Sequence, residues 1–347
     1  MLLWQYQMQK GKEMNKKVYQ IAIIGGGAAG IMASLRGALN NNEVILFPGT
    51  PKDKKKSRAL WVSKIENMPG YLDFKKGIVD SHNQTLEQLK VYDNFQTVTN
   101  EGIKSISKDS QGLFELTDSK DNKYKAQYVV LATGVMDVQP EIEGSIKPAL
   151  PYANVQLIDY CLRCDGHHVK GKKTAIIGHG VGAAWVAIML HEKYGTEIDI
   201  LANGEKTEFT ETENKLLSLY NIKVYANKIQ SIQGNVRKNK LESFTLDDGT
   251  VIPADISFIS LGMIVYNELA KDLGADLDKR GFVVTNSKGE TTVENLYAVG
   301  DIRAETKKQI YTAWDTAVDS LDDINAKIRK HKRELLLSQM QLSEVTC

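Results

Sequence analysis

Two cysteines lie three positions apart in this chain, Cys161 and Cys164, and an acid and two histidines follow them at once, Asp165, His167 and His168. Residues of these types at this spacing can form a metal site, a structural disulfide, or a redox pair that exchanges electrons with a cofactor. The chain contains three cysteines in all. The position of two of these three cysteines just before a glycine-rich turn therefore suggests that they have a chemical function.

A zinc site is the first alternative for the two cysteines. A structural site needs four ligands, and the remaining thiol is Cys347, at the end of the chain. His167 or His168 could add a third ligand, but no second pair of suitable spacing follows, so we predict no metal site. Haem attachment would require histidine directly after the second cysteine, where Asp165 stands. An inert pair of buried thiols remains an open alternative.

A redox dithiol accounts for more of the local sequence. The spacing lets the two sulfurs meet without rearrangement of the chain. Attack on another disulfide requires a thiolate, and the nearby Arg163, a helix amino terminus or a protonated histidine would lower a thiol pKa. Asp165 could deliver the proton that a leaving thiolate needs. We therefore predict Cys161, Cys164 and Asp165 as the catalytic residues.

A first glycine turn, GGGAAG, follows the apolar run 18–24 and begins a helix-like segment at 28–39. Its first glycine permits a tight turn, its second lets a pyrophosphate approach the backbone, and its third lets helix and strand pack closely. The helix amino terminus adds N–H donors and a partial positive charge. No acidic residue ends the next strand, so the ribose contact must come from backbone or the loop beyond. The predicted cofactor-binding residues of this turn are Gly25, Gly27, Ala28, Ala29 and Gly30.

A second turn, GHGVGA, follows the strand-like segment TAII. Its third small position holds alanine, which still permits close packing. No arginine pair follows the strand at 197–201 to hold a 2′-phosphate, so the sequence does not choose between NADPH and NADH. The predicted nicotinamide-site residues here are Gly178, Gly180, Val181 and Ala183.

The same plan therefore occurs twice: a glycine-turn βαβ unit, an antiparallel insertion, and an apolar strand ending in glycine, at 128–134 and again at 255–262. We predict an α/β fold of two Rossmann-like dinucleotide-binding domains, the second inserted into the first. Each would have three layers built on a parallel sheet with an antiparallel β insertion. The first insertion is expected to include short strands within 84–116, beginning at FQTVT.

Composition limits the functional class. The chain has 347 residues, 42% hydrophobic and 25% charged, with a net charge of +1. These values are typical of a soluble globular protein and give no reason to expect nucleic acid or a membrane as partner. No secretory signal and no apolar span of about 20 residues occurs, so we expect a cytoplasmic protein. Met14 is the expected start, which leaves residues 1–13 ahead of it, and residues 1–17 are expected to form an N-terminal extension without ordered structure.

Six motifs in order resemble the low-molecular-weight thioredoxin reductase family over residues 18–325. They are IIGGGAAG at 23–30, IENMPG at 65–70, LATG at 131–134, CLRCDG at 161–166, IIGHGVGAA at 176–184 and LYAVGDI at 296–302. The resemblance implies FAD at the first glycine turn and NADPH or NADH at the second. It places Cys164 nearest the flavin, makes Cys161 the sulfur that attacks an incoming disulfide, and makes Asp165 the general acid.

The same resemblance assigns further residues. Asp301 would hydrogen-bond the FAD ribitol, and Glu66 would lie near the flavin-side pocket. The other FAD contacts it implies are Asn67, Ala132, Thr133, Gly134, Gly300, Gln309 and Ile310. The expected domains are 18–140 with 263–330 for FAD, 141–262 for NAD(P) and the dithiol, and 331–347 as a C-terminal tail. Hinges are expected near 138–148 and 262–266.

The chain also departs from the family pattern, because the double arginine after the second nicotinamide strand is absent and SRALWVS replaces the usual glycines before IENMPG. The substrate is accordingly expected to be a thioredoxin-like protein or a small-molecule disulfide, handled by a homodimer. Two alternatives stay open: a reductase of this fold that takes electrons from ferredoxin, and a non-catalytic flavin and dithiol redox sensor.

Overall fold

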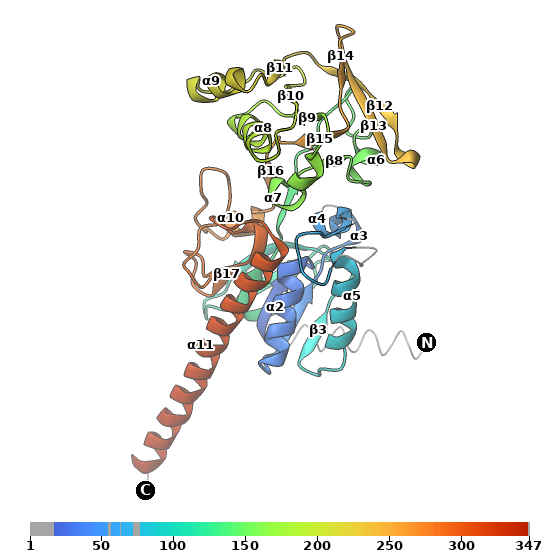
Figure 1. Ribbon diagram of the computed structural model, residues 1–347. Coiled ribbons are helices and arrows are strands. Elements are labelled where there is room, and N and C mark those ends of the chain that lie inside the picture. Colours follow the sequence, from blue (N-terminus) through green and yellow to red (C-terminus); the bar gives the residue numbers. More distant parts are fainter. Residues whose placement is uncertain (1–16, 55–56, 63, 72–76, 346–347) are drawn as a thin grey trace. The chain divides into compact units, whose positions relative to one another are not determined.

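The computed structural model describes residues 17–54, 57–62, 64–71 and 77–345 (Figure 1). The predicted N-terminal extension, apart from Lys17, and Cys347 lie outside the described residues. The described chain forms two compact units. Unit 1 comprises the described residues within 1–60, 78–135 and 265–347, and unit 2 comprises those within 61–77 and 136–264.

Unit 1 contains a parallel sheet in the order β3-β2-β1-β6, with β17 also paired to β6. Its parallel strands are β1 (Val18–Ile24), β2 (Val44–Phe47), β3 (Phe95–Thr97), β6 (Lys123–Leu131) and β17 (Leu296–Ala298). Parallel strands need long crossovers. The helices of unit 1 include α2 (Ala28–Leu39), α5 (Ile78–Leu89), α10 (Glu268–Asp272) and the 36-residue α11 (Ile310–Val345).

Strand β1 shows how the layers of unit 1 form. Ile21 and Ile23 pack in one core cluster with residues of α2, α5 and α11. Ala22 and Ile24 point to the opposite face and pack in a second cluster, together with Phe114 of the antiparallel strands. Because successive side chains of a strand alternate between faces, a strand buried on both sides must be apolar throughout. This explains the continuous apolar, buried stretch at 21–24 and gives unit 1 three layers.

The antiparallel insertion of unit 1 is smaller than the sequence suggested. It consists of β4 (Ile103–Lys108) and β5 (Phe114–Asp118), and β5 pairs antiparallel with the first half of β6. The prediction that the strand beginning at Phe95 belongs to this insertion is wrong, since β3 pairs parallel with β2. Helix α5 provides the crossover that turns the chain back to run parallel.

Unit 2 repeats this plan with a five-stranded parallel sheet in the order β11-β10-β9-β15-β8. These strands are β8 (Ile158–Asp159), β9 (Thr174–Ile177), β10 (Ile198–Leu201), β11 (Lys223–Tyr225) and β15 (Ile256–Ile259). Helices α8 (Val181–Tyr194) and α9 (Glu211–Leu219) pack on one face. An antiparallel sheet packs on the other, formed by β12 (Ile229–Asn235), β13 (Lys240–Leu246) and β14 (Val251–Pro253).

The chain passes between the units at four points, and two of them lie within β7 (Val135–Asp137) and β16 (Met263–Val265), which pair with each other. The insertion of the second Rossmann-like domain into the first is therefore as predicted. The remaining short helices are α3 (Pro51–Lys54), α4 (Arg58–Trp61), α6 (Leu150–Ala153) and α7 (Leu162–Asp165).

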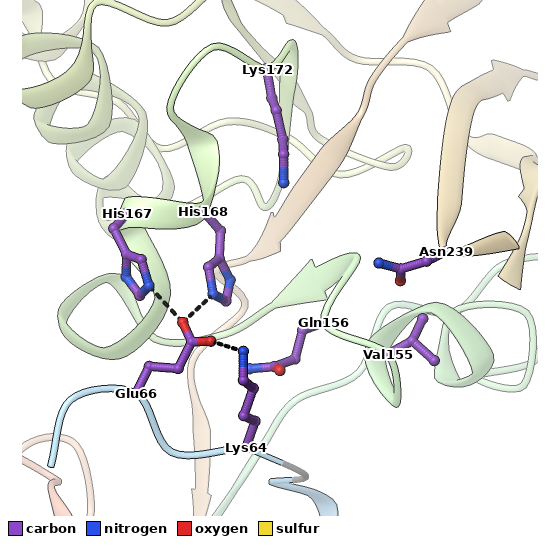
Figure 2. Close-up of a pocket in the computed structure, with 8 residues that line it drawn as sticks. All are labelled: Lys64, Glu66, Val155, Gln156, His167, His168, Lys172 and Asn239. Atoms are coloured by element: carbon purple, nitrogen blue, oxygen red, sulfur yellow. Dashed lines mark hydrogen bonds and ion pairs between the residues drawn. The ribbon is translucent and has the colours of Figure 1, made fainter. Parts of the chain in front are cut away.

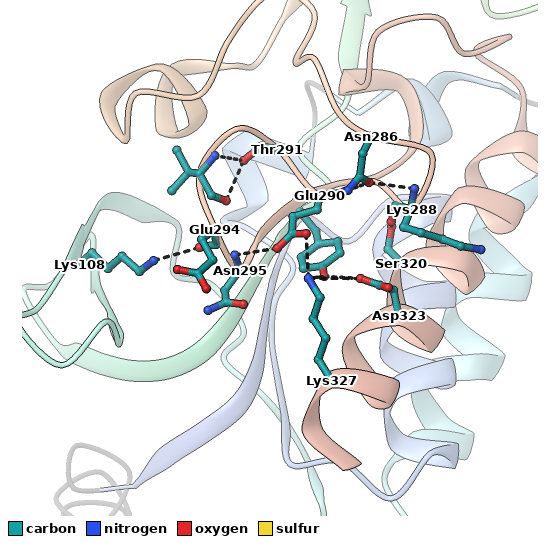
Figure 3. A network of polar contacts seen from close by, with 12 residues as sticks. Lys108, Asn286, Lys288, Glu290, Thr291, Glu294, Asn295, Ser320, Asp323 and Lys327 are labelled. Carbon is teal, nitrogen blue, oxygen red and sulfur yellow. Dashed lines mark hydrogen bonds and ion pairs between the residues drawn. The ribbon is translucent and has the colours of Figure 1, made fainter. Parts of the chain in front are cut away.

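Helix α11 is fixed to the sheet of unit 1 by partly buried polar contacts (Figure 3). Lys327 donates to Glu290 and to the Tyr297 hydroxyl, each at 2.7 Å, and that hydroxyl donates to Asp323 at 2.6 Å. The predicted tail continues α11 as helix as far as Val345. Among the described residues, α11 and every other helix are too short or too polar to span a bilayer.

Candidate functional site

The first glycine turn connects β1 to α2 and has little room for side chains. Gly25 has a φ of +115°, and a Cβ there would lie 2.2 Å from the Ala132 carbonyl oxygen. A Cβ at Gly30 would lie 1.9 Å from the Gly25 carbonyl oxygen. Both positions thus require glycine for the fold itself, because real Cβ atoms do not approach backbone so closely.

Gly27 is different, since a Cβ there would meet nothing within 4 Å. It is the N-cap of α2, so the free N–H groups of the first helical turn, from Ala28 onward, lie directly beyond it. Open space, free donors and a helix amino terminus together suit an anionic group such as a pyrophosphate. The residues of this turn therefore fit the diphosphate of a dinucleotide.

The closing motif LYAVGDI meets this turn at the carboxyl edge of the same sheet. Gly300 has a φ of +72°, and a Cβ there would lie 2.7 Å from the Ala29 methyl. Its N–H donates to the Thr316 hydroxyl at 3.0 Å. Next to it, Asp301 pairs with Arg58 at 3.1 Å, and both side chains are about four-fifths buried. Asp301 and Arg58, 243 positions apart in the sequence, are thus brought into contact.

Other predicted FAD residues also lie near this edge in unit 1. Ala132, Thr133 and Gly134 follow the end of β6, and the Thr133 hydroxyl donates to the Tyr266 carbonyl at 2.7 Å. Gln309 is 6% exposed, and its carbonyl accepts the Ala313 N–H at the start of α11, which Ile310 begins. Ligands of open α/β sheets bind outside the carboxyl ends of the strands.

The second glycine turn, between β9 and α8, repeats the first in unit 2. A Cβ at Gly178 would lie 2.4 Å from the Ser260 carbonyl oxygen, so this position also requires glycine. Gly180 is the N-cap of α8 and has nothing within 4 Å of its Cβ position. Val181 follows as the first, exposed residue of α8, and Ala183 is fully buried. This turn therefore fits a second dinucleotide.

The dithiol lies at the same carboxyl edge of the unit 2 sheet as the second turn. Strand β8 ends at Asp159 and leads to Cys161, which is the N-cap of α7. Cys161 and Cys164 form a disulfide with Cα atoms 5.2 Å apart, and the Cys164 N–H donates to the Cys161 sulfur at 3.2 Å. In this form neither sulfur is a thiolate that could ligate zinc. A backbone N–H on a sulfur also favours its thiolate form once the bond is opened.

A polar cluster within unit 2 adjoins the dithiol in sequence and lines a pocket of about 290 Å³ (Figure 2). Glu66 contacts the Nε2 atoms of His167 at 2.6 Å and of His168 at 2.9 Å, and forms an ion pair with Lys64. On its other side, His168 Nδ1 contacts the carboxylate of Asp159 at 2.8 Å. His168 thus lies between two carboxylates, one of them 3% exposed.

The charges of this cluster follow from its contacts. The hydrogen bond to Asp159, reinforced by that to Glu66, raises the pKa of His168 to about 9. The hydrogen bond from Lys64, followed by that from His168, lowers the pKa of Glu66 to about 2. In the structure as it stands, a cationic His168 imidazole therefore contacts the anionic Glu66 carboxylate, while burial raises the pKa of Asp159 on its other side.

Comparison with known proteins decides the family. The family model described as pyridine nucleotide-disulphide oxidoreductase matches residues 19–320. The chain belongs to this family.

Relatives within the family carry two kinds of name. A thioredoxin reductase of Borreliella burgdorferi is 25% identical over 314 residues, covering 88% of this chain and 92% of the relative. A ferredoxin–NADP reductase 2 of Bacillus thuringiensis is 26% identical over 298 residues, covering 83% of this chain and 86% of the relative. The crystal structure of thioredoxin reductase from Streptococcus pyogenes superposes with a TM-score of 0.76 at 22% identity, covering 90% of this chain and 99% of the other.

Membership in the pyridine nucleotide-disulphide oxidoreductase family confirms the resemblance predicted from the six motifs, and the structural match confirms the two Rossmann-like domains. The family membership identifies the protein as an oxidoreductase of the flavin and disulfide class. The roles of individual residues remain predictions.

One predicted segment is placed differently. The described residues within 61–77, which include Asn67 and which we expected in the FAD domain, group with unit 2. The contacts of Glu66 with the two histidines explain this grouping.

Sequence reasoning missed two features of the site. Strand β8 is only two residues long, too short for a periodic signal, yet it aligns the dithiol with the sheet. Asp159 ends that strand, and its contact with His168 could not be read from the sequence. An acid two positions before the first cysteine was the one available signal.

Proposed function

We propose that this protein is an FAD-dependent disulfide reductase that passes electrons from NADPH or NADH to the Cys161–Cys164 disulfide and on to an external disulfide. The observation that carries the proposal is a disulfide at the carboxyl edge of the unit 2 sheet, the edge that also holds a glycine turn fit for a dinucleotide. A nicotinamide-binding unit that carries its own dithiol suits transfer of reducing equivalents to sulfur.

FAD, when bound at the first turn, would accept hydride from the nicotinamide and supply the two electrons that open the disulfide. The chain's own residues then complete the exchange. The Cys161 thiolate attacks one sulfur of the substrate disulfide, and the substrate's other sulfur leaves, taking a proton from Asp165. The Cys164 thiolate next attacks Cys161, which reforms the intramolecular disulfide and releases the substrate as a dithiol.

The Rossmann-like units would hold both cofactors through backbone. Gly27 with the amino terminus of α2 would hold the FAD diphosphate, and Gly180 with that of α8 would hold the diphosphate of the nicotinamide cofactor. Asp301, now paired with Arg58, would accept from the ribitol hydroxyls. We further propose a cytoplasmic homodimer whose substrate is a thioredoxin-like protein or a small-molecule disulfide.

The relatives named ferredoxin–NADP reductase suggest a second candidate function, in which ferredoxin exchanges electrons with the flavin. The disulfide favours the first function, because transfer between ferredoxin and flavin needs no dithiol. A redox sensor would carry the dithiol without turnover.

Cys164→Ser tests the proposed function. The variant should keep its FAD and still be reduced by NADPH or NADH, but disulfide reduction should fall to background because the closing sulfur is missing. The measurement pairs an anaerobic titration followed by flavin absorbance with a steady-state assay on a thioredoxin disulfide. Cys347→Ser is the matched control and should behave as wild type.

Wild-type rates of disulfide reduction in Cys164→Ser would refute the proposal. Bleaching by reduced ferredoxin but by neither nicotinamide would support the second function instead. Slow oxidation of the dithiol without turnover would support the sensor.

A further inference from the structure

Three potential metal ligands converge within unit 2, beside the dithiol. The Glu66 oxygen Oε2 lies 2.6 Å from Nε2 of His167 and 2.9 Å from Nε2 of His168. One ligand atom from each of the three residues lies within 4.8 Å of the other two. Figure 2 shows both imidazole rings directed at the same carboxylate. Two imidazoles and one carboxylate are a ligand set that divalent transition metals bind in proteins.

A further contact orients one of these ligands. The Nδ1 atom of His168 faces Asp159 at 2.8 Å, and Asp159 is 3% exposed at the end of β8. Metal-binding histidines commonly direct their second ring nitrogen at a carboxylate, which fixes the ring and makes the ligating nitrogen more basic. His168 already has this arrangement, with its Nε2 directed at Glu66.

The site is also accessible from solvent. The side chain of His167 is 50% exposed, and the three residues line the pocket of about 290 Å³ described above. Lys64 pairs with the other carboxylate oxygen, Oε1, and its side chain is 47% exposed. Its ammonium can therefore stay on Oε1, or move into solvent, while an ion occupies the side of Oε2.

We propose that Glu66, His167 and His168 bind one divalent transition-metal ion, with Zn²⁺ as the best match, and that Asp159 positions His168 for it. Two nitrogen ligands favour zinc-like ions over Mg²⁺ or Ca²⁺, which prefer oxygen. Three protein ligands leave the fourth position for water. The ion would tie residues 64–71 to the turn that follows the dithiol. This site uses neither cysteine, so it is independent of the proposed disulfide chemistry.

This site also revises the sequence-based expectation that no metal is bound. That expectation depended on counting ligands near the cysteines. The third ligand, Glu66, lies 102 positions from His168 in the sequence, where no spacing rule would look for it.

Zinc binding to the oxidised, full-length protein tests the proposal. All proteins carry Cys347→Ser, and the intact disulfide keeps the other two sulfurs from ligating. After equilibrium dialysis, bound Zn²⁺ is counted by elemental analysis, and its Kd is measured by calorimetric titration. We expect one ion per chain in the parent protein. His167→Asn, His168→Asn and Glu66→Gln should each raise the Kd by more than about 100-fold, because each removes a direct ligand.

Two more variants sharpen the test. Asp159→Asn should raise the Kd by about 10- to 100-fold, as expected of a residue that only orients a ligand. His331→Asn, an exposed histidine on α11 in unit 1, is the matched control and should bind as the parent does. Circular dichroism checks that each variant is folded. His167→Asn keeps the test decisive if a more buried variant fails that check.

A Cys161→Ser, Cys164→Ser double variant separates this proposal from the proposed function. It cannot reduce disulfides, yet it should still bind one ion. No bound zinc in the parent, an unchanged Kd in His167→Asn, or loss of the ion in the double variant would overturn the proposal.

Discussion

The two glycine turns occupy equivalent places in the two units, yet their steric demands differ. In both, the first glycine abuts a carbonyl at the end of the neighbouring strand, Ala132 for Gly25 and Ser260 for Gly178. In both, the second glycine is the N-cap of the following helix and borders open space. The third position distinguishes them, since unit 1 holds glycine and unit 2 holds a buried alanine.

The structure explains this difference. At Gly30 a methyl group would collide with the backbone oxygen of Gly25, whereas the Ala183 methyl fits beside Gly178, which has no side chain. The helix of unit 1 thus approaches its own turn too closely for any side chain. The first glycine is required by its contact with the sheet, the second leaves open space for the proposed ligand, and the third is required for helix packing only in unit 1, where the helix comes closest.

Substituting the third glycine of the unit 1 turn, Gly30, should have the largest effect on stability. Gly30→Ala is expected to lower the free energy of unfolding of the flavin-free protein by about 1–3 kcal/mol, because the added methyl has no room. It should also weaken FAD binding. Urea unfolding followed by circular dichroism measures the change. Gly182→Ala in α8 is the matched control, since a Cβ there would meet only the Ser260 hydroxyl, at 3.6 Å. A loss of stability as large in the control would contradict the comparison.

The second position should separate binding from folding. Gly27→Ala is expected to weaken FAD binding and Gly180→Ala to weaken nicotinamide binding, each by about tenfold or more. Each methyl would occupy space that the fold leaves empty for a diphosphate. The free energy of unfolding should change by less than about 0.5 kcal/mol, as for other substitutions without new contacts. Flavin content and the KM for NADPH and NADH check the two arms. An effect of Gly180→Ala on flavin content, with the KM unchanged, would count against the assignment.

Ala183→Gly makes unit 2 resemble unit 1 at the third position. Removing this methyl does not fill the open space at Gly180, so nicotinamide binding should be unaffected. The helix should lose about 0.5–1 kcal/mol through the higher backbone entropy of glycine. Urea unfolding and the KM for the nicotinamide measure the two effects. A changed KM with unchanged stability would show that this alanine contacts the ligand.

The units also differ in how they bury charge, and pH should reveal it. Unit 2 pairs its buried Asp159 with His168, whereas unit 1 directs the Lys308 ammonium at the Arg303 carbonyl, at 2.5 Å, and holds it over the Phe282 ring, at 3.9 Å. Burial lowers the pKa of Lys308 to about 8 from its ordinary value of 10.5.

Between about pH 8 and pH 10.5, the folded and ordinary pKa values of Lys308, the unfolded chain binds more protons at Lys308 than the folded chain does. The stability of the flavin-free protein should therefore rise as the pH increases from about 8 towards 10.5. We expect this to be the smallest effect, measured as the urea midpoint across that range, and Lys308→Met should flatten the rise. An equal rise in the variant would assign it to another group.

The local features of this protein follow from its amino-acid sequence alone. Each strand, glycine turn and helix start of the two βαβ units depends on residues within a few positions of one another, as at Gly25 to Gly30. Period, turn chemistry and small residues specify such structure directly. The pairing of Cys161 with Cys164 is equally local, because three positions of spacing bring the sulfurs together. These parts of the fold and of the site could be predicted.

The contacts between segments far apart in the sequence, in contrast, become known only from the folded structure. It paired β3 with β2, aligned the two-residue β8 with β15, and brought Gly300 against Ala29. It also brought Glu66 to His168. These contacts depend on the order of strands in a sheet and on the closure of long loops, and many sequences of equal local character would close them differently. The two glycine turns follow from local sequence, whereas the proposed metal site depends on the folded chain bringing its ligands together.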